Sequence, residues 1–142
     1  MREEVLSVLG DDFETMREVP LYVKYQKPFS ENRISKADIV AKKGNQILVV
    51  EVEATEDPSP KLVIADIMTT NLATECVFRK KPIRLSNVWL FIVAREFKDK
   101  SIKRRQLLRI KNHLKLGKGC LRDFDVCPIG GFKEKLADRG SK

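Results

Sequence analysis

Three acidic residues lie in or directly after apolar segments in the first half of the chain. Asp38 interrupts one such segment, and Glu51 and Glu53 follow the apolar run 47–50. A carboxylate in these surroundings needs a partner or a cation, because a buried, isolated charge is costly. Alternation along a strand puts Glu51 and Glu53 on one face, and a turn at 43–45 brings Asp38 toward them. The spacing therefore predicts three converging carboxylates and a cation between them.

The two glutamates also have a simpler interpretation. On a solvated edge strand, Glu51 and Glu53 would pair with Lys24, Arg33 or Lys42 of neighbouring strands. Alternation alone favours this interpretation. The apolar run that leads directly into Glu51 favours the cation site. The chain's excess of positive charge favours it too, because an acidic cluster in such a chain needs a cation more than it needs another salt bridge.

Composition limits the class of protein. The chain has 142 residues, the size of one ordinary domain, and its 28 Lys and Arg against 20 Asp and Glu give a net charge of +8. Such an excess favours attraction to polyanions such as nucleic acid. There is no apolar stretch of about 18 residues and no charged-then-apolar leader, so we expect a cytoplasmic protein without a membrane span.

The basic residues gather in two segments, one before the apolar run 88–94 and one on a predicted helix after it. Side chains of this kind would neutralise several phosphates and make binding dependent on salt. The alternative is a solvated helix face, which is what most charge runs form. The residues that we expect to contact nucleic acid are Lys80, Lys81, Lys103, Arg104, Arg105 and Arg109.

The cysteines do not indicate a metal site. Cys76, Cys120 and Cys127 form no CxxC pair, and a zinc site would have to recruit His113, the only histidine. Small thiols in apolar surroundings more often simply pack.

Apolar periodicity predicts the order of the elements. Leu6, Leu9, Phe13 and Met16 follow helical spacing, with a candidate break at 10–12. Alternation and apolar runs indicate strands. The predicted elements are a helix at 2–17, strands at 20–27, 34–42 and 46–54, a helix from Ser59-Pro60 onward, a strand at 88–94, a helix at 101–116 and a strand at 120–127.

Several details of these elements follow from local chemistry. Ser59 suits an N-cap because a proline follows it, and the apolar residues spread over 62–73 predict a helix buried on more than one side. The run 88–94 is apolar throughout, as expected of a central strand covered on both faces. We expect 79–82 to be a basic connection and 128–142 to be a polar, mobile tail.

This order of elements, with Asp38 on the second strand and Glu51-x-Glu53 on the third, resembles the PD-(D/E)xK nuclease superfamily over residues 1–127. The short spacing is similar to that of archaeal Holliday-junction resolvases. The resemblance implies a single α/β domain with a restriction-endonuclease-like core, a mixed sheet of about five strands flanked by helices. It also implies that Asp38 and Glu51 bind Mg²⁺ or Mn²⁺, with the Val52 carbonyl nearby.

The sequence departs from the family pattern at two positions. The proline that usually precedes Asp38 is absent, and Glu53 stands where the family usually has lysine. Lys61, on the following helix, is the candidate to restore that positive charge. Glu53 would act as a third ligand, admit a second ion or serve as general base. Glu4 or Glu14 is a further candidate to complete the site.

The resemblance implies a metal-dependent DNA endonuclease, resolvase-like or restriction-like, whose catalytic residues are Asp38, Glu51, Glu53 and Lys61. A homodimer would suit a two-stranded substrate. The alternative is a catalytically inactive nuclease-fold protein that binds nucleic acid or a protein partner in transcription or repair. The glutamate in place of the lysine is the feature that supports this alternative.

Overall fold

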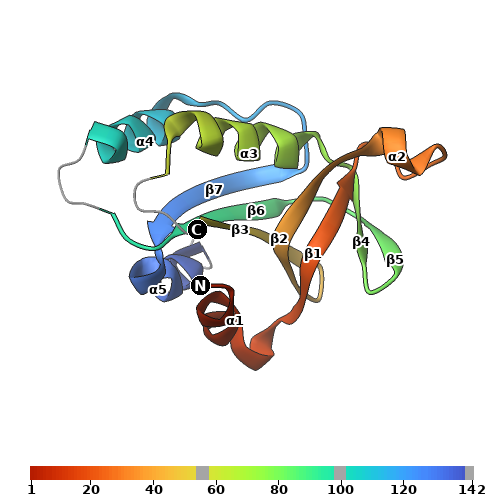
Figure 1. Cartoon of the computed structure of the whole chain (residues 1–142), viewed down its shortest axis with the longest axis horizontal. Coiled ribbons are helices and arrows are strands. Elements are labelled where there is room, and N and C mark those ends of the chain that lie inside the picture. The colour runs from red at the N-terminus through yellow and green to blue at the C-terminus, as the bar shows by residue number, and fades with distance from the viewer. Residues whose placement is uncertain (54–57, 98–101, 140–142) are drawn as a thin grey trace.

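A seven-stranded mixed sheet with helices on both faces forms the structure (Figure 1). The computed structural model describes residues 1–53, 58–97 and 102–139, and only the backbone of 102–104. The strands are β1 (Glu14–Tyr22), β2 (Arg33–Lys43), β3 (Gln46–Glu53), β4 (Glu75–Phe78), β5 (Lys81–Arg84), β6 (Val88–Ala94) and β7 (Leu121–Pro128). The helices are α1 (Arg2–Leu9), the 3-10 helix η1 (Gly10–Asp12), α2 (Phe29–Asn32), α3 (Pro60–Leu72), α4 (Ile102–His113) and α5 (Ile129–Asp138).

The strand order in the sheet is β5-β4-β1-β2-β3-β6-β7. β1, β2 and β3 pair antiparallel, whereas β3, β6 and β7 pair parallel. The predicted α/β class and mixed sheet between helices are confirmed. The predicted count of about five strands is wrong, because the hairpin of β4 and β5 extends the sheet beyond β1.

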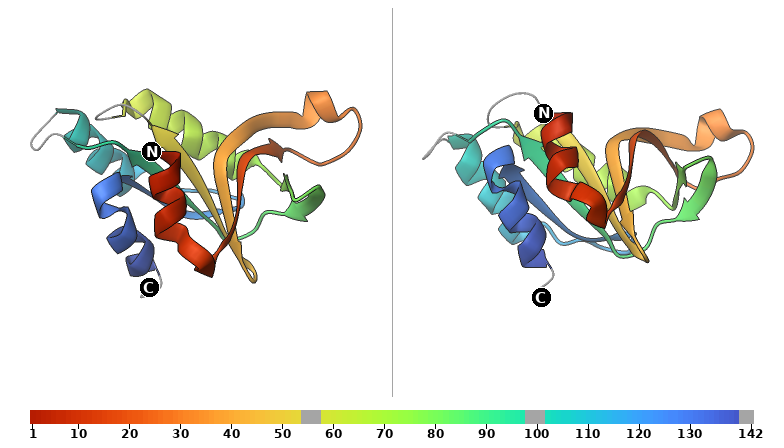
Figure 2. Two further views of the ribbon diagram at one scale, coloured as in Figure 1. Left: turned by 60° about the horizontal axis from the view of Figure 1, so that its bottom comes forward. Right: turned by 90° about the horizontal axis from the view of Figure 1, so that it is seen from below.

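Two apolar cores lie on the two faces of the sheet. α3 and α4 cover one face, where Val63, Ile67 and Leu107 are buried against the strands. α1 and α5 lie side by side on the other face, and Val5 and Phe132 are fully buried there (Figure 2). β6 runs between the two cores and all its residues are buried, as the unbroken apolar run 88–94 predicts.

The N-terminal helix is shorter than predicted and the next strand begins earlier. α1 ends at Leu9, where Gly10 adopts φ +59, a conformation that glycine takes without a Cβ penalty. Residues 14–17, which continue the helical spacing in sequence, instead pair with residues 39–42 of β2. The predicted strand at 20–27 is therefore displaced, because pairing along the long β2 outweighs the local helical pattern.

The segment 79–82 comprises a two-residue hairpin turn and the first two residues of β5, rather than a simple connection. Arg79 and Lys80 both adopt positive φ, and they join β4 to β5. Cys76 of β4 is fully buried and pairs with Leu21 of β1, which attaches the hairpin to the sheet. β4 and β5 have four residues each, which is too short for an alternation of apolar and polar residues to be recognised in the sequence.

α3 begins as predicted but is less buried. The Ser59 hydroxyl accepts a hydrogen bond from the Leu62 N–H at 3.2 Å and Pro60 is the first helical residue. One face of α3 packs on the sheet, whereas Ile64, Met68 and Leu72 are between 41% and 59% exposed. The prediction of burial on more than one side is therefore wrong.

Residues 129–138, expected to belong to a polar tail, form α5. Phe132 is fully buried, and its ring meets the ring of Phe91 edge-on at 5.3 Å between centroids. The packed structure thus extends to residue 138 in place of 127. None of the described helices is long and apolar enough to cross a membrane.

We expect Phe132→Ala to lower the free energy of unfolding by about 3–5 kcal/mol, because it leaves a cavity between α5 and β6. Urea unfolding followed by circular dichroism measures this change. Lys133→Ala, an exposed neighbour on the same helix, is the control and should change stability by less than about 0.5 kcal/mol. Equal stability of the Phe132→Ala protein and the parent would show that α5 does not contribute to the core.

Candidate carboxylate site

β2 and β3 stop pairing where the predicted acidic residues lie. Their ladder runs from Lys43 and Gln46 to Ile39 and Val50. Beyond it, Asp38 Oδ2 accepts a hydrogen bond from the Val52 N–H at 2.7 Å. The Asp38 side chain thereby replaces a backbone ladder bond, while β3 continues beside β6. This contact involves the Val52 amide, whereas the sequence prediction concerned its carbonyl.

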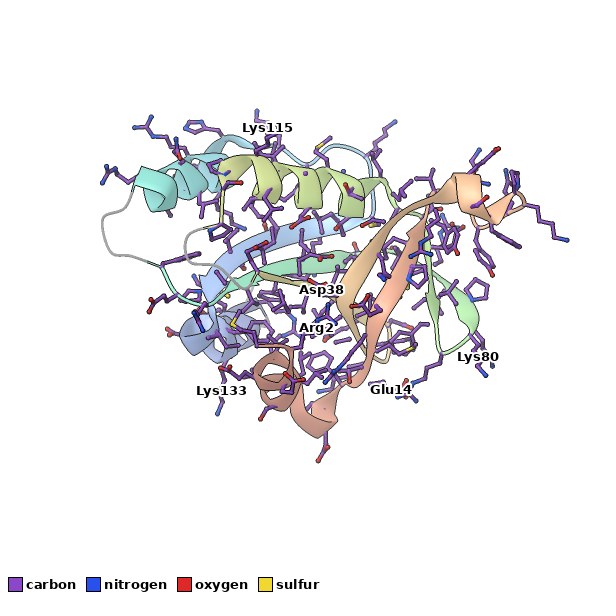
Figure 3. The ribbon with its side chains drawn as sticks, in the orientation of Figure 1. Arg2, Glu14, Asp38, Lys80, Lys115 and Lys133 are labelled. Atoms are coloured by element: carbon purple, nitrogen blue, oxygen red, sulfur yellow. The ribbon has the colours of Figure 1, made fainter. Side chains whose placement is uncertain are left out.

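Arg2 of α1 is the positive charge closest to Asp38 in the described contacts (Figure 3). Its Nη2 lies 3.2 Å from Asp38 Oδ1 and 2.6 Å from Glu18 Oε1. Lys36 Nζ lies 2.7 Å from the other oxygen of Glu18. Glu18 has φ +55 and lies between the paired residues of β1, opposite Asp38. Two basic and two acidic side chains therefore form an ion-pair network at this edge of the site.

Glu51 lies beside Asp38 and is only partly accessible. Burial, followed by the charges of Asp38 and Asp66, raises the pKa of Glu51 to about 9. A carboxyl group in this state is neutral at pH 7. Glu51 would therefore ionise readily only if a positive charge came close to it.

Asp66 of α3 is a fourth carboxylate at the site, and sequence analysis missed it. Burial, followed by the charges of Glu53 and Asp38, raises the pKa of Asp66 to about 6. Asp66 is therefore within electrostatic range of both residues. A signal for Asp66 was present in the sequence, because it is the only acid in the otherwise largely apolar helix 60–72. We name Asp38, Glu51, Glu53 and Asp66 the carboxylate site.

Lys61 does not share the face of α3 that carries Asp66. It is exposed, and five helical positions place its side chain about 140° around α3 from Asp66. Glu4 and Glu14 also lie elsewhere. Glu4 is 3.9 Å from the N-terminal amine, and Glu14 is 3.9 Å from Arg79 at the far end of β1.

The predicted phosphate-contacting residues fall into two separate groups. Lys80 and Lys81 are exposed on the β4–β5 hairpin, and Arg105 and Arg109 are exposed on α4. The hairpin and α4 lie at opposite ends of the molecule (Figures 1 and 2). The side chains of Lys103 and Arg104 lie outside the described residues.

The donor types of the carboxylate site suit a hard cation, since Mg²⁺ and Mn²⁺ prefer oxygen ligands. Among the described residues, however, no group of three His, Cys, Asp or Glu side chains is arranged so that it could hold a metal ion. Arg2 and the Val52 amide instead contact the two oxygens of Asp38. The donor types therefore suit a cation, whereas the described side chains are not arranged around one and Arg2 contacts one expected ligand. The three cysteines are buried and free.

Comparison of the chain with protein-family models, with curated proteins and with solved structures found no match.

We expect stability without metal to fall as the pH rises, because Glu51 is protonated in the folded state up to about pH 9 and in the unfolded state only to about pH 4.5. The folded state binds more protons in this window. At about 1.4 kcal/mol per pH unit, its free energy of unfolding should therefore drop by on the order of 5 kcal/mol between about pH 5 and pH 9.

Glu51→Gln should remove at least half of that drop, because the amide stays neutral at every pH. Urea unfolding in the presence of a chelator, at several pH values, measures the slope. Glu134→Gln, which changes an exposed glutamate of α5, should keep the slope of the parent protein. An identical slope in the Glu51→Gln protein would contradict the assignment of the raised pKa to this residue.

Proposed function

We propose that the chain is a divalent-metal-dependent endonuclease that hydrolyses phosphodiester bonds in DNA. The observation that carries this proposal is the carboxylate site, where burial and then the charges of neighbouring acids raise the pKa of Glu51 to about 9 and that of Asp66 to about 6. Acids that repel one another in this way are costly unless a cation or protons offset them. A divalent cation is the ligand that relieves this repulsion most directly.

The positions of the side chains suggest their roles. Asp38 and Glu51 would hold the cation, and Glu53 and Asp66 would complete the negative surface around it. When bound, Mg²⁺ supplies the positive charge that phosphodiester hydrolysis requires at its transition state. Glu53 is the candidate to take a proton from the attacking water, since the structure has no lysine at that position.

The arrangement of strands supports the same proposal. β1, β2, β3, β6 and β7 are consecutive neighbours in the sheet. They are the five strands of the succession that, by its resemblance to the PD-(D/E)xK superfamily, implies a restriction-endonuclease-like core. The acids lie on the second and third of these strands, as the resemblance implies.

DNA would be held through its phosphates. Arg105, Arg109, Lys80 and Lys81 are exposed and carry the charge that such binding needs. Because the hairpin and α4 lie at opposite ends of the molecule, each group would contact a different part of a long duplex or branched DNA (Figure 1). Such binding would weaken steeply as salt is raised.

Titration of Mg²⁺ and Mn²⁺ into the protein by calorimetry tests the cation site. We expect binding that Asp38→Asn weakens at least tenfold, because the amide removes the charge yet still accepts the Val52 N–H. Asp12→Asn is the matched control, since Asp12 is an exposed acid outside the site. Absence of binding in the parent protein, both alone and with DNA present, would refute the cation site.

The same proteins test the chemistry. With Mg²⁺ or Mn²⁺, the parent and the Asp12→Asn control should cleave at least one of duplex, flap, single-stranded and branched DNA. The Asp38→Asn protein should lose at least about a hundredfold in rate. If the parent binds the cation but cleaves none of these substrates, the endonuclease proposal fails although the cation site stands.

Arg2 is expected to compete with the cation for Asp38. Arg2→Gln should therefore tighten Mn²⁺ binding about three- to tenfold, because it removes a positive charge 3.2 Å from Asp38 Oδ1. Calorimetry at constant ionic strength measures the change. Arg17→Gln, whose ion pair with Glu3 at 3.4 Å lies elsewhere, should leave the affinity unchanged. Weaker binding in the Arg2→Gln protein would show that Arg2 supports the site instead.

A second candidate function is a nuclease-fold protein that binds DNA or a protein partner without cleaving it. Three observations favour it: glutamate at the lysine position, an exposed Lys61 and an Asp38 already neutralised by Arg2. This function would show DNA binding that is unchanged by a chelator and by Asp38→Asn. If the chain is instead an endonuclease, it should cleave DNA, and both the chelator and Asp38→Asn should abolish that cleavage.

A further inference from the structure

A cavity of about 570 Å³ lies at the C-terminal end of α3. The segment after β1, the β4–β5 hairpin and the loop before β7 form its other walls. Its polar lining consists chiefly of Lys24, Arg84, Lys118, Glu75, Thr74 and Ser86. No member of the carboxylate site lines it. The cavity is therefore a separate feature of the molecule, and its volume is in the usual range for small-molecule sites.

Positive charge dominates this cavity. Lys24, Arg84 and Lys118 reach it from three different segments, and no ion pair joins any of them to a carboxylate within the described parts of the chain. The single acid, Glu75, is engaged otherwise. It accepts hydrogen bonds from the Thr74 hydroxyl and, at 3.2 Å, from the Tyr25 N–H. Three cations and one anion leave a net charge of +2 around the cavity.

Two of the cavity walls are joined through Thr74. The Lys24 N–H donates to the Thr74 hydroxyl at 2.6 Å. The Leu85 N–H donates to the Thr74 carbonyl at 2.8 Å, next to Arg84. Lys24 and Arg84 therefore stem from backbone that is fixed to one residue.

The third wall is fixed by Asn71. Its side-chain oxygen accepts the Leu121 N–H at 3.0 Å, and its carbonyl accepts the Cys120 N–H at 3.3 Å. A Cβ on Gly119 would lie 2.3 Å from the Asn71 oxygen, so only glycine allows this approach. Lys118 directly precedes this contact. The backbone at or next to each of the three cations is thus held in place before any ligand arrives, so that binding has to order only their exposed side chains.

We propose that this cavity binds a terminal phosphate group, that is, a phosphate monoester dianion. Lysine and arginine donors around one space suit the several oxygens and double charge of such a group, and the Ser86 hydroxyl adds a neutral donor. An internal phosphodiester carries one charge and has chain on both sides, so it fits a pocket of this kind less well. The phosphate belongs either to a small phosphorylated molecule or to the 5′ end of a nucleic-acid strand. The proposal does not depend on the carboxylate site.

The test is calorimetric titration in the presence of EDTA, which keeps divalent cations and cleavage out of the measurement. The probes are inorganic pyrophosphate and a six-nucleotide DNA strand with either a 5′-phosphate or a 5′-hydroxyl. The variants are Arg84→Gln and Lys118→Gln. Lys80→Gln is the matched control, because Lys80 is an exposed cation on the same hairpin but does not line the cavity. Circular dichroism confirms that each variant is folded.

We expect Arg84→Gln and Lys118→Gln each to weaken binding of a phosphate-bearing probe at least fivefold, with less than a twofold change for Lys80→Gln. A preference for the 5′-phosphorylated strand over the 5′-hydroxyl strand that Arg84→Gln removes would support a strand end as the source. Pyrophosphate binding without that preference would support a small phosphorylated molecule.

Two results would overturn the proposal. One is the absence of binding by pyrophosphate and by the 5′-phosphorylated strand at low ionic strength. The other is an equal loss of affinity in the Lys80→Gln control, which would mean that general surface charge attracts the probe. Because no divalent cation is present, either result leaves the endonuclease proposal to its own test.

Discussion

The hydrogen bond from the Val52 N–H to Asp38 holds together the part of the sheet on which the rest of the site depends. At Ile39 and Val50 the ladder between β2 and β3 ends, yet β3 must remain beside β6 to keep the core closed. A side-chain acceptor at 2.7 Å satisfies the amide that the departing strand leaves behind. Asp38 also acts on the pKa of Glu51 and of Asp66, so the residue that completes the sheet is also part of the carboxylate site.

The charges around Asp38 determine which kind of ligand the carboxylate site favours. The chain carries a net charge of +8, but its partly buried acids are concentrated where Glu51 reaches a pKa of about 9. Arg2 offsets part of this charge at Asp38 and Glu18, on the side of α1. On the side of α3, Asp66 forms no ion pair with a basic side chain of the described residues. A cation that approached between these sides would replace repulsion with ligation.

α3 connects the two regions that we propose to bind ligands. Its middle carries Asp66 of the carboxylate site, and its last turn carries Asn71, which fixes the loop before β7. The buried residues Val63 and Ile67 attach the same helix to the sheet. A rigid helix of 13 residues therefore sets the position of both regions, while its outer face with Ile64 and Met68 stays exposed.

The sequence by itself determined the central strand 88–94, the helix start at Ser59 and the acids on two adjoining strands, because periodicity, capping and turns act over a few residues. Only the tertiary structure decided that Arg2 meets Asp38, 36 positions away, and that Asp66 joins the site. It also made 14–17 a strand, since the partner on β2 outweighed a helical pattern, and it buried Phe132 of the expected tail. These outcomes depend on which surfaces pack together, and local residue spacing carries no information about that.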